Sequence, residues 1–133
     1  MGPKLCARCL VVDADPLVRW TVVHSLQTQC LDARSIESGE LAIVVLREWP
    51  VDFLIAESHL PSMDGVELAK RCQNLNCRPS TILLTDGQPP LPPRELHGLG
   101  VIGVIEKPFI LDPLARLLAG VAQKEKNEKG AAT

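Results

Sequence analysis

Residues 51–65 read VDFLIAESHLPSMDG and place an acid, Glu57, at the end of an apolar run that predicts a buried strand. A loop containing proline and glycine follows directly. A carboxylate at such a point is either removed from water at a cost in free energy or used by the protein. The stretch therefore raises two questions: what Glu57 contacts, and why glutamate stands there and not the shorter aspartate.

Apolar runs of strand length recur along the chain and alternate with helical patterns. Strands are expected at residues 9–12, 33–37, 52–56, 80–85 and 101–106. This alternation predicts an α/β fold with a doubly wound, mostly parallel sheet and helices on both faces. At 133 residues and 46% hydrophobic content, the chain has room for one such domain. We expect the domain to cover residues 5–122 and the charged tail, residues 123–133, to be disordered.

Helix starts are marked by side chains that can cap a helix N-terminus. Asp15 precedes Pro16, a proline suited to the first helical position. Ser38 and Asp64 open two further helical patterns, and Asp112 precedes another proline.

Core or helix-packing roles are expected for both tryptophans, Trp20 and Trp49. The first helix is expected to pack through one face, made of Leu17, Trp20, Val23 and Leu26.

Residues 86–100, DGQPPLPPRELHGLG, break this rhythm because they hold four prolines where a fourth helix should lie. Proline is tolerated only in the first turn of a helix, so this helix should be about two turns long. We expect it to start near Pro92 or Pro93. Residues 88–93 are expected to form a rigid polyproline-like loop, with a docking ligand for a partner as the alternative.

Charge and the N-terminal sequence exclude several classes of function. The net charge is −2, with acids and bases mixed along the chain, so no electrostatic surface for DNA or RNA is indicated. The N-terminal apolar run is too short for a signal peptide or a membrane span. We therefore expect a cytoplasmic protein without direct contact to nucleic acid or membrane.

The five cysteines are expected to stay reduced. Cys6 and Cys9 form a C-x-x-C pair that could be redox-active or half of a zinc site, with Cys72 and Cys77 as the other half. The first pair enters a strand, and four residues separate the second pair. Small buried hydrophobic residues are therefore the favoured interpretation.

Polar side chains follow four of the expected strands. Asp13 ends the first strand, Glu57 the third, Thr85 the fourth and Lys107 the fifth. In an open parallel sheet, function gathers at the carboxyl ends of the strands, so these four groups should converge at one edge. No glycine-rich phosphate loop follows the first strand, which argues against a dinucleotide-binding or P-loop enzyme.

With these residues in place, the chain resembles the receiver domain of bacterial response regulators. The matching segments are CLVVDADPLVR at residues 9–19, DFLIAESHLPSMDGVEL at 52–68, ILLT at 82–85 and EKPF at 106–109. The resemblance implies a flavodoxin-like sheet of strand order 2-1-3-4-5. It also implies phosphoryl transfer to an aspartate after the third strand, with Mg²⁺ held by acids after the first.

On this resemblance the metal ligands would be Asp13, the acceptor residue and the backbone carbonyl of His59, whose side chain is expected to be exposed. Ala14 stands where the family has a second metal-binding acid. Mg²⁺ requires oxygen ligands in near-octahedral geometry, so this replacement should leave the site weak or absent. Asp15, one position later, could compensate, although its role as a helix cap is favoured.

Glu57 occupies the phosphoacceptor position, Thr85 that of the hydroxyl that meets the phosphoryl group, and Lys107 that of the ammonium that pairs with it. The extra methylene of Glu57 adds about 1.3 Å of reach. It misplaces the attacking oxygen but carries the carboxylate toward Lys107 and Thr85. Val104 stands where the family usually has an aromatic switch residue, and the peptide before Pro108 is expected to be cis by resemblance.

The sequence thus favours a pseudo-receiver, a non-enzymatic signalling module that acts by protein contact, with Glu57 as a partial stand-in for a phosphorylated aspartate. An ion pair between Glu57 and Lys107 without signalling meaning is equally supported. Two other functions stay open: a receiver still phosphorylated by a histidine kinase, and a cleft adapted to a small molecule. The expected partner is a histidine kinase or another signalling protein, and a homodimer is also left open.

Overall fold

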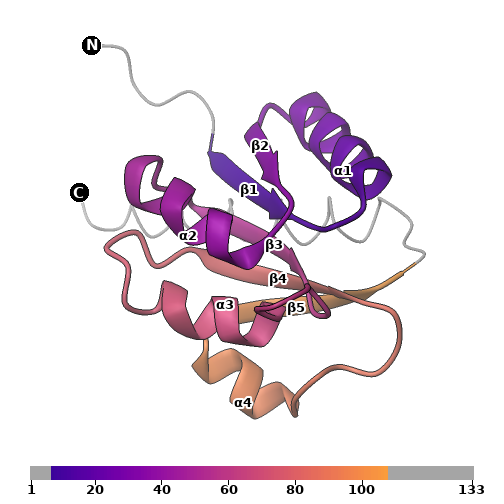
Figure 1. The fold of residues 1–133 in the computed structure, drawn as a ribbon, viewed down its shortest axis with the longest axis vertical. Helices are drawn as coiled ribbons and strands as arrows, with labels where there is room; N and C mark the ends of the chain where they lie inside the picture. Colours follow the sequence, from indigo (N-terminus) through magenta and orange to yellow (C-terminus); the bar gives the residue numbers. More distant parts are fainter. Residues whose placement is uncertain (1–6, 108–133) are drawn as a thin grey trace, which may run out of the picture.

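The computed structural model describes residues 7–107, which form one five-stranded parallel sheet. The strand order is β2-β1-β3-β4-β5, as the resemblance to receiver domains implies (Figure 1). The bounds are β1 Arg8–Val12, β2 Asp32–Ile36, β3 Phe53–Glu57, β4 Ser80–Thr85 and β5 Val101–Glu106. Because β1 lies next to β3 in this order, the carboxyl ends of the first and third strands are neighbours.

The described helices begin where the capping residues predict. Their bounds are α1 Pro16–Thr28, α2 Gly39–Glu48, α3 Gly65–Cys72 and α4 Pro93–Gly98. The side-chain oxygens of Asp15, Ser38 and Asp64 each accept a hydrogen bond from a backbone N–H in the first turn. Helix α4 starts at one of the two expected prolines and is six residues long. The helix expected after Asp112 lies outside the described residues.

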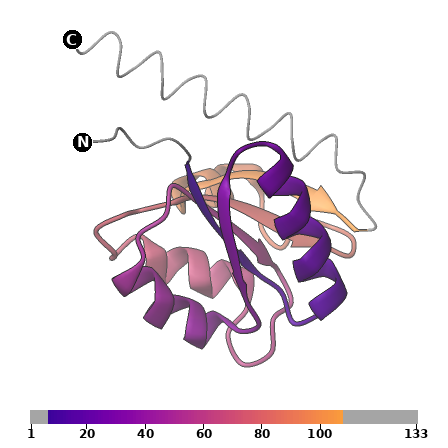
Figure 2. The same cartoon turned by 90° about the horizontal axis from the view of Figure 1, so that it is seen from above.

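The two faces of the sheet carry separate hydrophobic cores. Along β3, Leu54 and Ala56 enter the core that α2, α3 and α4 cover, whereas Phe53 and Ile55 enter the core under α1. Figures 1 and 2 show α1 on one side of the sheet and α2 and α3 on the other. The alternation of a strand's side chains between two apolar layers explains why β3 reads as a continuous apolar run.

Helix α1 packs through a different face from the expected one. Leu17 is 69% exposed and Trp20 is 65% exposed, while Val22 and Leu26 are buried. Positions spaced by three residues fall about 60° short of a full turn at each step, so Leu17 and Leu26 lie on opposite sides of the helix. The core role expected for Trp20 is therefore wrong. Its ring stacks on His24 with a centroid distance of 5.1 Å.

Trp49 has the packing role that the sequence predicts. It is buried next to the core under α2, and the guanidinium of Arg34 lies 4.1 Å from its ring centroid. The cysteines Cys9 and Cys72 are also buried, in the cores on opposite faces of the sheet. Burial raises the pKa of the Cys72 thiol to about 12, so it is a neutral, small apolar group at physiological pH.

Residues 7–107 include no helix with the length and apolar character that a bilayer span would require.

Candidate functional site

Three charged side chains from three strand ends meet at the carboxyl edge of the sheet. The Lys107 Nζ donates to Asp13 Oδ2 at 2.8 Å and to Glu57 Oε1 at 3.1 Å. The contact expected between Glu57 and Lys107 is therefore present. The carboxylate of Asp13 is fully buried, and the Lys107 and Glu57 side chains are each 15% exposed. One ammonium thus bridges two carboxylates in a setting largely closed to water.

Asp13 uses both carboxylate oxygens within the protein. Its Oδ1 accepts a hydrogen bond from the backbone N–H of Asp15 at 2.9 Å, and its Oδ2 accepts from Lys107. The Asp15 carboxylate caps α1 by accepting from the Leu17 N–H at 2.9 Å. Asp15 thus has the capping role that the sequence favours for it.

The backbone that carries Glu57 is held in place by the start of α3. The Gly65 N–H donates to the Ser58 carbonyl at 3.0 Å. A Cβ on Gly65 would lie 2.6 Å from the Glu57 carbonyl oxygen, a separation that real side chains do not adopt. Glycine is therefore required at this position by close backbone approach. Gly65, the last residue of the M-D-G segment, thus allows the start of α3 to pack closely against the end of β3.

The electrostatics of the cluster follow from two acids sharing one base. Burial raises the pKa of Glu57 above its ordinary value, and the nearby Asp13 raises it further; the hydrogen bond from Lys107 lowers it without compensating. For Lys107, burial alone would lower the pKa, but the hydrogen bonds to Asp13 and Glu57 outweigh burial and raise it. The lysine is thus held as an ammonium, and Glu57 takes up a proton more readily than a free glutamate.

This raised pKa predicts an unusual pH dependence of stability. The folded state binds the Glu57 proton more tightly than the unfolded state, so the free energy of unfolding contributed by this group rises as pH falls through its folded pKa toward 4.5. Relative to Glu57→Gln, which does not titrate, the wild type should gain stability between pH 7 and pH 4.5. Chemical denaturation of both proteins across this range measures the difference. A wild type that loses stability relative to the variant would contradict the prediction.

Thr85 lies beside the cluster but directs its hydroxyl to the loop after β4. The residue is 2% exposed; its Oγ1 donates to the Gln88 carbonyl at 3.2 Å and accepts from the Gly87 N–H at 3.3 Å. The Lys107 N–H donates to the Thr85 carbonyl at 2.6 Å, so backbone contacts join the two residues. Thr85 therefore fixes the loop into α4, and a role toward a phosphoryl group stays a prediction.

The oxygen donors at this edge do not fit the Mg²⁺ site that the resemblance implies. Ala14 offers no side-chain oxygen, and both carboxylate oxygens of Asp13 already accept hydrogen bonds. His59 is exposed, as expected. Within residues 7–107 no group of three or more histidine, cysteine or acidic side chains is arranged to hold a metal. Mg²⁺ needs a near-octahedral set of oxygens, and the two carboxylates of Asp13 and Glu57, which share Lys107, do not supply it without an acid at position 14.

Arg19 is a residue of this site that the sequence analysis missed. Its Nη1 donates to the Asp13 carbonyl at 2.7 Å and to the Ala14 carbonyl at 3.2 Å. Long side chains on a helix point back toward its N-terminus, so an arginine one turn into α1 can reach the loop before it. That rule was the available signal, but it does not say which of several exposed residues will make the contact.

Comparison with known proteins identifies the family. Residues 9–119 match the family model described as the response regulator receiver domain. This chain belongs to that family. The receiver also resembles the heme response regulator HssR of Staphylococcus aureus, with 36% identity over 67 residues. That match covers 50% of the receiver chain and 30% of HssR, so the receiver spans less than a third of this relative.

Solved structures agree with the fold. The chemotaxis protein CheY4 of Vibrio cholerae superposes with a TM-score of 0.77 at 27% identity, covering 87% of the receiver and 98% of CheY4. The signal receiver domain of a putative LuxO repressor protein from Vibrio parahaemolyticus gives a TM-score of 0.85 at 21% identity, covering 97% and 99% of the two chains. The second likeness speaks for the fold alone.

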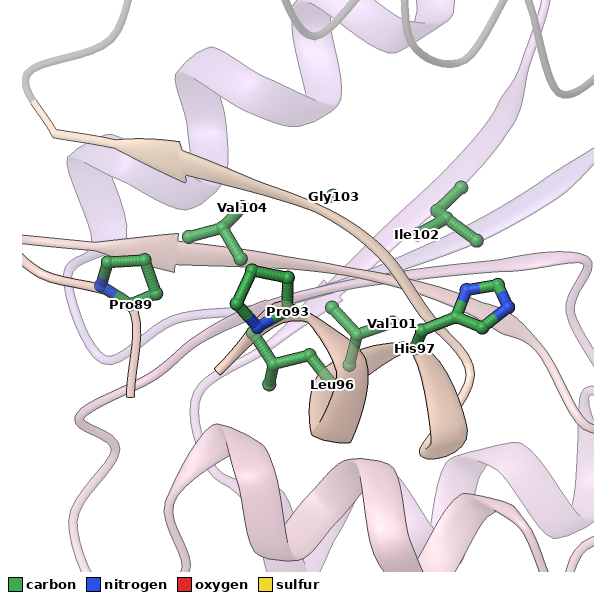
Figure 3. A pocket seen from close by; sticks show the side chains of 8 residues that line it. All are labelled: Pro89, Pro93, Leu96, His97, Val101, Ile102, Gly103 and Val104. Atoms are coloured by element: carbon green, nitrogen blue, oxygen red, sulfur yellow. The ribbon is translucent and has the colours of Figure 1, made fainter. Parts of the chain in front are cut away.

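An apolar pocket of about 430 Å³ lies beside Val104, where the family usually has its aromatic switch residue. Figure 3 shows Pro89 and Pro93 at one side of the pocket, with Leu96 and His97 of α4 and Val101 to Val104 of β5 around it. The pocket is formed by α4, β5 and Pro89 of the loop before α4, and the ion cluster of Asp13, Glu57 and Lys107 does not line it.

Proposed function

We propose that this receiver is an atypical signalling module that acts by protein contact and takes up no phosphoryl group at Glu57. The observation that carries the proposal is the 3.1 Å contact between Glu57 Oε1 and Lys107 Nζ. By resemblance, Lys107 is the residue that would pair with a phosphorylated acceptor. In this chain Glu57 already bonds Lys107. Part of the negative charge that phosphorylation would add at this position is therefore present without it.

The geometry of attack also supports the proposal. Phosphoryl transfer depends on the position of the attacking oxygen and on a cation that neutralises the charge of the donor. The side chain of Glu57 is one methylene longer than aspartate, and Ala14 removes a carboxylate from the metal position. Each change weakens one of these two requirements, so their combination in one chain favours loss of the reaction over adjustment of its rate.

Glu57 imitates only part of a phosphorylated aspartate. Its carboxylate carries about one negative charge, whereas a phosphoryl group carries nearly two. The raised pKa of Glu57 reduces this charge further at acidic pH. We therefore expect a single conformational state with partial active character, which no kinase can switch. A histidine kinase or another signalling protein remains the expected partner, through surface contact and with no enzymatic turnover by the receiver.

A phosphodonor assay tests the proposal. The full chain is incubated with acetyl phosphate and Mg²⁺, and separately with beryllofluoride and Mg²⁺, and intact mass and ¹⁹F NMR are recorded. We expect an unchanged mass and no bound fluoride signal. A stoichiometric, Mg²⁺-dependent adduct mapped to Glu57 would overturn the proposal and establish a receiver that is still phosphorylated. A receiver with an aspartate acceptor, treated in parallel, controls for the reagents.

A further inference from the structure

Two cations of the chain itself lie against the acidic edge of the sheet. Lys107 bonds the carboxylates of Asp13 and Glu57, at 2.8 and 3.1 Å. Arg19 bonds the backbone carbonyls of Asp13 and Ala14, at 2.7 and 3.2 Å. The first cation joins β5 to β1 and β3, and the second joins α1 to the loop that follows β1. These two side chains thus join α1, β1, β3 and β5 at this edge.

The formal charges of this cluster cancel. Asp13 and Glu57 contribute two negative charges, and Lys107 and Arg19 contribute two positive charges, so these four groups sum to zero. The exposed carboxylate of Asp15, which caps α1, lies outside this set. Asp13 is fully buried and the Lys107 side chain is 15% exposed, so solvent screens this pair weakly, whereas the contact of Arg19 with Ala14 is exposed. A divalent cation would add two charges to a cluster that is already neutral, and would gain little from it.

The oxygens that Asp13 and Ala14 present at this edge already accept hydrogen bonds. Both carboxylate oxygens of Asp13 accept hydrogen bonds, from the Asp15 N–H and from Lys107. The carbonyls of Asp13 and Ala14 accept from Arg19. Coordination of a metal at these oxygens would compete with charge-assisted hydrogen bonds, in which the donor or the acceptor is ionised and which are the stronger class.

We propose that Arg19 and Lys107 together replace the divalent cation, so that this edge of the receiver is held in one arrangement without metal. Arg19 acts as the positioning residue, because its forked guanidinium holds two successive carbonyls of the loop after β1. The proposal concerns non-covalent cation binding and stands apart from the absence of a phosphoryl adduct. Either can fail while the other holds, since one is measured by melting and the other by mass.

The test is the melting temperature of the full chain in millimolar MgCl₂ and in EDTA. The wild type should melt at the same temperature in both. Arg19→Met removes a positive charge and frees two carbonyls, so it should lower the melting temperature by about 4 °C in EDTA. It should recover part of that loss in MgCl₂, because the cluster then carries a net negative charge. Arg47→Met, at an exposed arginine of α2, is the matched control and should show neither effect.

Two results would overturn the proposal. One is a saturable rise in the melting temperature of the wild type with Mg²⁺, which would mean that the oxygens of this edge are available to a metal. The other is an Arg19→Met protein that melts like Arg47→Met in both solutions. If Arg19→Met does not fold, Arg19→Lys takes its place. Lysine keeps the positive charge but lacks the guanidinium that bonds both carbonyls. This variant should therefore melt below the wild type, and its melting temperature should not depend on Mg²⁺.

Discussion

The double variant Glu57→Asp with Ala14→Asp is expected to be labelled by a small phosphodonor in the presence of Mg²⁺, to about one phosphoryl group per chain. The shorter acid withdraws the attacking oxygen from Lys107 by about 1.3 Å, and the new carboxylate at position 14 supplies the missing oxygen ligand. Misplacement by about 1 Å can cost roughly 100-fold in rate, so labelling should exceed that of the wild type by at least this factor. Intact mass with and without EDTA measures it.

The single variants separate the two causes. Ala14→Asp alone should gain Mg²⁺ affinity without efficient labelling, and Glu57→Asp alone should be labelled slowly because the metal remains weakly held. Glu48→Asp, at the exposed end of α2, makes the same chemical change away from the site and should leave labelling at the wild-type level. A double variant without Mg²⁺-dependent label would show that the pocket differs from an active one at further positions.

Lys107→Met is expected to be the most destabilising single change at this edge, by about 3 kcal/mol, or roughly 10 °C in melting temperature. It leaves two carboxylates close together, one of them on the fully buried Asp13, without the ammonium that bonds both. Breaking a buried pair from one side costs more than the pair contributes, because an uncompensated charge remains. Urea denaturation of the full chain gives the free energy of unfolding.

Two further variants decide the cause of that loss. Lys70→Met, at an exposed lysine of α3, controls for the loss of an ammonium as such and should cost little. Adding Asp13→Asn to Lys107→Met removes the unpaired buried charge and should restore part of the stability. If Lys107→Met unfolds at the same denaturant concentration as Lys70→Met, the ion cluster contributes nothing measurable.

The strands and the helix starts were predictable because each depends on local chemistry. The capping residues Asp15, Ser38 and Asp64 sit at the helix N-termini as expected. The buried strands can be recognised in the sequence as continuous apolar runs of strand length. The motifs that carry the resemblance to receivers then fix the order of the strands, which apolar length alone leaves open.

The packing face of α1 was not predictable in the same way. Its apolar residues surround much of the helix, so several stripes satisfy a spacing of three or four residues. Only the docking of α1 on the sheet chooses Val22 and Leu26 and leaves Trp20 exposed. Local propensity contains no information about that choice.

At the site, the convergence of Asp13, Glu57 and Lys107 followed from topology, since strand ends of a parallel sheet meet at one edge. The direction of the Thr85 hydroxyl did not, because a rotatable hydroxyl takes whichever partner lies nearest, here the loop from Gly87 to Gln88. Arg19 was missed for a related reason: its target is backbone carbonyls, which every residue carries and which leave no mark in a sequence.

Gly65 packs directly against the backbone carbonyl of Glu57, and this close contact limits how the edge of the sheet can change by substitution. The close approach of Gly65 leaves the main chain at position 57 no room to move toward α3, so we expect side chains to accommodate most of the extra length of a longer acid. Exchanging glutamate and aspartate therefore changes the chemistry of the edge while the scaffold stays still. If the proposed function holds, loss or recovery of phosphoryl transfer at this edge would require changes of side chains and no rearrangement of the backbone that Gly65 contacts.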